Sequence, residues 1–195
     1  MNVTTWSLQM FRPGTRPPRR LPDDVRLDRA TGIDPEYARF LYGLIGGPWH
    51  WTDLLGWSRE EWTAELSVPG TEFWILYDAG VPAGYVHLQP ALEPDGTHVE
   101  IRYFGLAARA IGRGLGGPLL EHGIDAAWTL PERSGLPPVT RVWVHTCSLD
   151  GPAALNNYRS RGLVVYAEEV TDENVAPEPP GAWAATGGPP SGSTG

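Results

Sequence analysis

Four glycines lie close together where an expected strand gives way to an expected helix. They are Gly112, Gly114, Gly116 and Gly117, with Arg113 among them. Glycine reaches positive φ at little cost and has no side chain to obstruct a ligand, so consecutive backbone N–H groups can converge. A helix that begins there directs the positive end of its dipole at the same point. The cluster therefore predicts binding of a phosphate or pyrophosphate.

The glycine spacing is compatible with more than one kind of site. Gly112, Gly114 and Gly117 satisfy the GxGxxG dinucleotide fingerprint, which keeps a dinucleotide-dependent oxidoreductase as a lesser alternative. A Rossmann domain would place this turn after its first strand, with an acidic residue about 20 positions later ending the second strand. Here Glu132 falls in an expected loop. A Walker A loop is excluded because the chain contains no lysine. A plain turn that packs a helix on a strand is the structural alternative.

Hydrophobic periodicity and turn residues divide the chain into alternating elements. Strands are expected over residues 4–10, 25–29, 71–78, 81–88, 99–106, 141–147 and 163–168. Helices are expected over 35–46, 58–66, 115–128 and 152–161, the last capped by Asp150, with a loop over 131–138. This order predicts an α/β (α+β) fold with a sheet of mixed direction.

The segment YFGLAARAIGRGLGGPLL resembles the acyl-CoA-binding signature of the GNAT superfamily of N-acetyltransferases. In that family a strand leads into Gln/Arg-x-x-Gly-x-Gly/Ala at the start of a helix. The match puts Gly114 and Gly116 at the required glycines and Ile111 at the Gln/Arg position, where it departs from the pattern; Arg109 could supply a nearby charge. The resemblance, over residues 25–170, implies a mostly antiparallel central sheet flanked by helices.

The resemblance also implies that acetyl-CoA is the co-substrate, with its pyrophosphate on the backbone amides of the glycine turn. Strand residues before the turn would bind its pantetheine arm. The implied cofactor-binding residues are Phe104, Gly105, Leu106, Ile111, Gly112, Arg113, Gly114, Leu115, Gly116, Gly117 and Asn157.

A second segment, LDGPAALNNYRSRGL, resembles the other family signature, an Ala-rich helix with an Asn/Leu-Tyr pair. By that match Tyr158 is the acid that protonates the departing thiolate, and Asn157 or Asn156 contacts the pantetheine. Leu163 stands where the family has phenylalanine. The structural alternative is a helix tyrosine that packs on the last strand.

Glu100 occupies the strand position where some family members hold a glutamate as general base. Residues two apart in a strand share a face, so the alternative is an ion pair on a solvated face, either between Glu100 and Arg102 or across to a neighbouring strand. His98 and His145 are the other candidates for proton transfer.

Aromatic residues are dense between residues 49 and 62, which could be core or the wall of a pocket. The resemblance places this segment at the acceptor site. The expected substrate-binding residues are Trp49, His50, Trp51 and His145.

A chain of 195 residues is long enough for one well-cored domain. We expect an N-terminal strand and extended arm over 1–24, the acetyltransferase domain over 25–170 and a disordered Pro/Gly/Ala-rich tail over 171–195. Cys147 is the single cysteine, which excludes an internal disulfide and favours a reducing, cytoplasmic location. No apolar run suits a membrane span, and no His/Cys spacing indicates a metal site.

The net charge of −8 argues against a nucleic-acid partner and is compatible with an amine substrate. The sequence thus predicts an N-acetyltransferase that moves an acetyl group from acetyl-CoA directly to a small amine in a ternary complex. The resemblance also allows a homodimer. The alternative from another class is a non-catalytic acyl-CoA-binding sensor.

Overall fold

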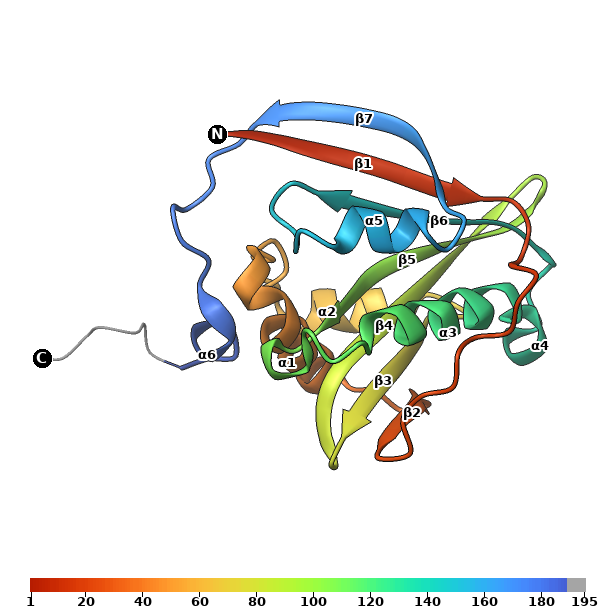
Figure 1. Cartoon of the computed structure of the whole chain (residues 1–195), viewed down its shortest axis with the longest axis horizontal. Helices are drawn as coiled ribbons and strands as arrows, with labels where there is room; N and C mark the ends of the chain where they lie inside the picture. Colours follow the sequence, from red (N-terminus) through yellow and green to blue (C-terminus); the bar gives the residue numbers. More distant parts are fainter. Residues whose placement is uncertain (189–195) are drawn as a thin grey trace, which may run out of the picture.

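A computed structural model describes residues 1–188 and contains one seven-stranded sheet. The strands are β1 (Asn2–Met10), β2 (Val25–Ala30), β3 (Glu72–Asp78), β4 (Val81–Glu93), β5 (Gly96–Leu106), β6 (Val139–Cys147) and β7 (Val164–Asp172). Their order in the sheet is β2-β3-β4-β5-β6-β1-β7 (Figure 1). Every neighbouring pair is antiparallel except β5 and β6, which are parallel. The predicted mixed, mostly antiparallel sheet is confirmed.

Helices and single helical turns connect the strands. They are α1 (Pro35–Gly46), η1 (Gly47–Trp49), α2 (Arg59–Leu66), η2 (Ala108–Ala110), α3 (Gly116–Trp128), α4 (Pro131–Ser134), α5 (Ala154–Arg159) and α6 (Gly181–Ala185). The Asp34 side chain accepts a hydrogen bond from the Tyr37 N–H, and Ser58 forms a capping box with Glu61. Within residues 1–188, every helix is too short or too polar to cross a membrane.

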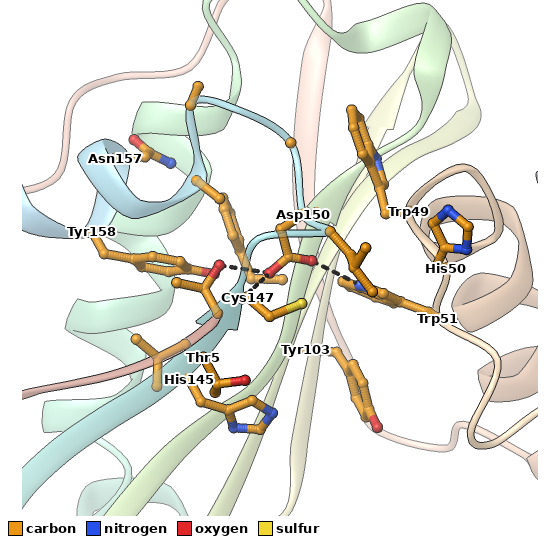
Figure 2. A pocket seen from close by; sticks show the side chains of 18 of the residues that line it. Thr5, Trp49, His50, Trp51, Tyr103, His145, Cys147, Asp150, Asn157 and Tyr158 are labelled. Atoms are coloured by element: carbon orange, nitrogen blue, oxygen red, sulfur yellow. Dashed lines mark hydrogen bonds between the residues drawn. The ribbon is translucent and has the colours of Figure 1, made fainter. Parts of the chain in front are cut away.

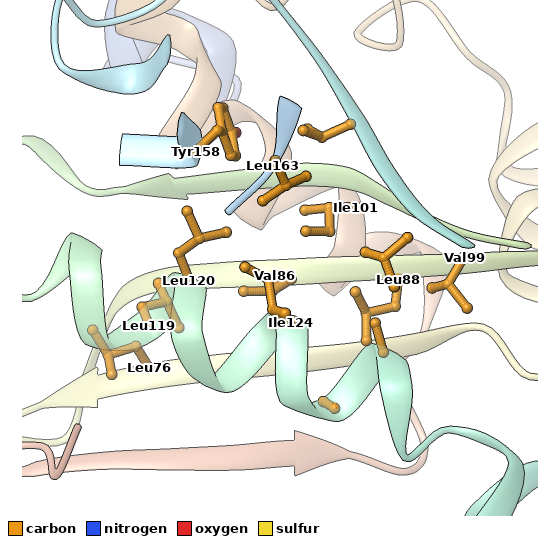
Figure 3. Close-up of a cluster of buried hydrophobic side chains, with 14 of the residues drawn as sticks. Leu76, Val86, Leu88, Val99, Ile101, Leu119, Leu120, Ile124, Tyr158 and Leu163 are labelled. Atoms are coloured by element: carbon orange, nitrogen blue, oxygen red, sulfur yellow. The ribbon is translucent and has the colours of Figure 1, made fainter. Parts of the chain in front are cut away.

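Helices cover both faces of the sheet, and each face has its own apolar core. On one face, α3 and Tyr158 of α5 pack on the central strands through residues such as Leu119, Leu120 and Ile101 (Figure 3). On the other face, α1 and α2 pack on β3 and β4. The central strands are therefore held rigidly from both sides, which fixes the ends that build the site.

β1 lies inside the sheet, between β6 and β7, although its sequence was expected to belong to a separate N-terminal segment (Figure 1). Val3, Leu8 and Met10 are buried. The polar residues between them obscure this pattern in the sequence. β1 therefore joins the last strand to the rest of the fold.

Two segments expected to be irregular contain short helices. Residues 131–134 form α4, where Arg133 donates to both carboxylate oxygens of the buried Glu72 at 2.8 and 3.0 Å. In the tail, α6 packs on α1 and η1, where Gly43 and Gly47 present no side chain to it. The part of the expected disordered tail over 189–195 lies outside the described residues.

The parallel pair β5–β6 is short. Within the described chain it extends only from Thr97 to Glu100 of β5, opposite Val139 to Trp143 of β6. Beyond that point β5 stays paired with β4, and β6 stays paired with β1. The sheet therefore opens between the ends of β5 and β6.

Candidate active site

A cavity of about 640 Å³ occupies the opening between β5 and β6 (Figure 2). We call it the central cavity. It is bounded by the ends of both strands, the segment after η1, the loop after β6 and α5. The predicted site residues on its wall are Trp49, His50, Trp51, Phe104, Gly105, Leu106, Ile111, Gly116, His145, Asn157 and Tyr158. Residues distant in the sequence are thus brought to one hollow.

The glycine turn meets this cavity at the start of α3. Gly112 and Gly114 have φ values of 80° and 75°, and a Cβ at either position would meet nothing within 4 Å. Leu115 is the N-cap residue of α3, and within residues 1–188 no side chain accepts a capping hydrogen bond there. The N–H groups of the first turn of α3 therefore stay available to a ligand. The Leu115 side chain is buried in the core, which leaves only its backbone for binding. The open space and free donors suit a pyrophosphate.

Arg113 and Arg109 lie outside the wall of the central cavity and bind Asp78 at the end of β3. Arg109 Nη1 lies 2.9 Å from Asp78 Oδ2, and Arg113 pairs with the same oxygen. The hydrogen bond from Arg113 lowers the pKa of Asp78. Arg109 also donates to the Val81 carbonyl at 2.8 Å. The two arginines therefore anchor the glycine turn to the β3–β4 hairpin.

Tyr158 lies on the cavity wall with 4% of its surface exposed. Its ring packs edge-to-face on Phe104, with 5.9 Å between centroids. Burial raises its pKa, and the negative charge of Asp150 acts in the same direction. The phenol is therefore protonated at neutral pH and can act as a proton donor. The packing alternative also holds, since the same ring belongs to the core of Figure 3.

Glu100 and His145 form a pair beside the central cavity. Glu100 Oε1 lies 3.3 Å from His145 Nδ1, and Glu100 Oε2 lies 3.4 Å from Arg102 Nη1. The hydrogen bond to Glu100 raises the pKa of His145, with burial opposing it. Glu100 is buried and absent from the cavity wall, whereas His145 lines it. The ion pair between Glu100 and Arg102 forms as expected. Glu100 is buried, however, so the pair does not lie on a solvated face.

His98, the other expected proton carrier, points elsewhere. Its Nε2 lies 3.0 Å from Asp95 Oδ1 in the turn before β5, and it does not line the central cavity. The structure therefore groups His145, and not His98, with the other site residues.

Asp150 has a role in the site that differs from the one predicted from the sequence. It was expected to cap α5, but Ala153 holds that position. Its carboxylate accepts hydrogen bonds from Trp51 Nε1 at 3.2 Å, the Cys147 N–H at 3.1 Å and Thr146 Oγ1 at 2.5 Å. Figure 2 shows it between Tyr158 and Trp51. Asp150 thus connects the aromatic segment to the end of β6.

The aromatic segment combines both of its expected roles. Trp62 is buried in the core, whereas Trp49 and Trp51 line the cavity. Asp53, which the sequence did not single out, also lines it and accepts hydrogen bonds from Tyr42 and, at 3.3 Å, from Tyr103. A lone aspartate in a loop carries no spacing signal, so only the fold reveals it.

We expect Asp150→Ala to lower the free energy of unfolding by about 2 kcal/mol, because three donors lose a charged acceptor in a partly buried place. Denaturant unfolding measures this change. Asp23→Ala is the control, because its ion pair with Arg20 is 86% exposed on both sides and contributes little. Equal effects of the two substitutions would contradict the bridging role of Asp150.

Comparisons with known proteins identify a family model and similar solved structures. The model of the Acetyltransferase (GNAT) family matches residues 35–163. A GCN5-related N-acetyltransferase from Sphaerobacter thermophilus is 15% identical with a TM-score of 0.56, covering 86% of this chain and 50% of its own.

Two further structures are similar. A tandem GNAT protein from the clavulanic acid biosynthesis pathway has 15% identity and a TM-score of 0.60, over 87% of this chain and 51% of its own. An aminoglycoside acetyltransferase from an uncultured soil metagenomic sample has 14% identity and a TM-score of 0.59, over 79% of this chain and 97% of its own. The chain thus spans about half the length of the first two structures. No curated protein matches it in sequence.

Proposed function

Since the chain belongs to the GNAT family of acetyltransferases, we propose that it transfers an acetyl group from acetyl-CoA to the amine of a small molecule. One observation carries the proposal. The central cavity joins the open first turn of α3 to a wall that carries the protonated Tyr158 and His145, whose Nδ1 is paired with the buried Glu100 behind it. Direct acyl transfer to an amine requires an anion site, a base and an acid in one place.

The residues present fit acetyl-CoA. The glycine turn offers N–H donors and open space for the pyrophosphate. Where β5 and β6 separate, the backbone N–H and C=O groups on their facing edges have no partner in the sheet that residues 1–188 form. These groups can form hydrogen bonds with the amide groups of pantetheine. Asn157 lies on the same wall and supplies a further polar side chain. When bound, the cofactor supplies an acyl group activated as a thioester.

His145 and Tyr158 divide the proton transfers. With Nδ1 turned to Glu100, the other ring nitrogen of His145 can take the proton of the attacking amine, while Glu100 stabilises the resulting imidazolium. The amine nitrogen forms the amide bond as the carbon–sulfur bond breaks. Tyr158 then gives its phenolic proton to the departing sulfur, so the products are an amide and a thiol.

The charges on the acceptor side favour a cationic amine. Asp53, Asp150 and Glu173 line the cavity. Arg102, also on the wall, is paired with Glu65 and Glu100. The uncompensated carboxylates attract a protonated amine and orient it. The similar aminoglycoside acetyltransferase, whose structure was determined in complex with sisomicin, supports an acceptor of this kind.

We expect the wild-type protein to bind acetyl-CoA with micromolar affinity and Gly114→Glu to lose binding, because the new carboxylate repels the pyrophosphate. Calorimetry measures both affinities. Gly135→Glu is the matched control, because Gly135 has a φ of 72° and equal open space. Equal losses in both variants would assign the effect to backbone strain, and no binding by the wild type would overturn the proposal.

A further inference from the structure

A second hollow, of about 590 Å³, lies between the N-terminal arm and α3. We call it the arm hollow. The arm (residues 11–24) leaves β1 and passes α3 on its way to β2 (Figure 1). Its residues 13–19 form one wall of the hollow, and the other wall includes Glu121, Trp128 and Arg161. Nothing in the reaction described above uses this hollow.

Two arginines meet at the end of the arm hollow nearest the glycine turn. A Cβ on Gly117 would overlap the guanidinium groups of both Arg19 and Arg161, so both lie directly over the first turn of α3. Both bind the same carboxylate. Arg19 Nη2 and Arg161 Nη2 lie 2.8 and 3.2 Å from Glu121 Oε1. The two guanidinium groups share one carboxylate, and the charges of Arg16 and Asp125, which also line the hollow, offset each other, so one positive charge remains in excess.

Arg161 is the fixed member of this pair. Its side chain is 14% exposed, and it donates to the carbonyl oxygens of Gly117 at 3.1 Å and Asn157 at 2.9 Å. Burial lowers its pKa, and the like charge of Arg19 acts in the same direction. Asn157 also lines the central cavity, so Arg161 stands at the boundary between the two hollows.

Arg19 is the accessible member. Its side chain is 59% exposed, and its backbone N–H and Nε both donate to Glu121 at 3.0 Å. Within the part of the chain that the structure describes, its Nη1 forms no hydrogen bond. The arginine is thus oriented by Glu121, and the Nη1 edge of its guanidinium is free for a second anion.

We propose that Arg19 and Arg161 bind a phosphate group of coenzyme A where it leaves the glycine turn toward the arm hollow. The proposal rests on the proposed function, because it requires coenzyme A in the central cavity. A guanidinium binds phosphate through paired N–H donors, and the first turn of α3 adds the favourable end of its dipole. The N-terminal arm is then part of the cofactor site and not a detached segment.

Coenzyme A carries phosphate at two places that share this chemistry, the pyrophosphate and the ribose 3′-phosphate. Calorimetry of the full chain with coenzyme A and with 3′-dephospho-coenzyme A distinguishes them. We expect Arg19→Gln to weaken coenzyme A binding about tenfold, as loss of a charge-assisted hydrogen bond does. Arg20→Gln is the control, because the neighbouring Arg20 binds only the exposed Asp23 among residues 1–188 and should leave binding unchanged.

Each outcome decides the proposal. A loss with coenzyme A alone assigns the pair to the ribose 3′-phosphate, and equal losses with both ligands assign it to the pyrophosphate. Wild-type affinity of Arg19→Gln for both ligands overturns the inference while leaving the proposed function intact. If the wild type binds neither ligand, the proposed function and the inference both fall.

Discussion

Tyr158→Phe is expected to lower kcat for amine acetylation a hundredfold to a thousandfold, about the contribution of one positioned general acid. Burial and Asp150 keep the phenol protonated, so it is a proton donor that the phenylalanine ring cannot replace. Phenylalanine preserves the edge-to-face contact with Phe104, so the fold and acetyl-CoA affinity should change little. Steady-state kinetics and calorimetry on the same preparations separate the two effects.

Tyr166→Phe is the matched control, because Tyr166 is 46% exposed on β7 and does not line the central cavity. Full activity of Tyr158→Phe would assign the thiolate proton to another group. If the wild type binds acetyl-CoA but acetylates none of a broad set of small amines, and Tyr158→Phe leaves every property unchanged, the non-catalytic acyl-CoA sensor becomes the better interpretation.

Local motifs explain which parts of the site could be predicted. The glycine turn and the helix of Tyr158 are each encoded within a short stretch, because glycine conformation and hydrophobic periodicity depend on neighbouring residues. The same holds for α1 and α2, whose caps lie where the sequence placed them. These elements could therefore be predicted without knowing any contact between distant residues.

The remaining parts depend on pairings between distant residues. β1 enters the sheet because Trp6 faces Thr146 on one side and Glu168 on the other, neighbours that no local pattern encodes. Asp150 meets Trp51 only because the sheet opens between β5 and β6. Arg19 likewise reaches α3 across 102 positions of sequence. No local pattern marks Arg19 as the partner of Glu121, and the pairing is visible only in the fold.

His145→Gln is expected to lower kcat about a hundredfold and to remove the rise of kcat with pH. A base must be neutral to accept a proton, and Glu100 raises the pKa of His145 above its ordinary value of 6.5. The rate should therefore increase as the pH rises through this elevated pKa and level off above it. Kinetics at a series of pH values with one amine measure this, since the ionisation of the amine is then common to all variants.

Glu100→Gln tests the partnership directly. Without the carboxylate, the pKa of His145 should fall toward its ordinary value, so the rising part of the profile should move to lower pH, while Glu100 acting as the base itself would make the rise vanish. His98→Gln is the control, because His98 binds Asp95 away from the cavity and should leave the profile unchanged. Loss of the pH dependence in His98→Gln and its retention in His145→Gln would reverse the assignment of the base. A shifted but intact rise in Glu100→Gln would instead identify Glu100 as a positioning residue that acts through His145.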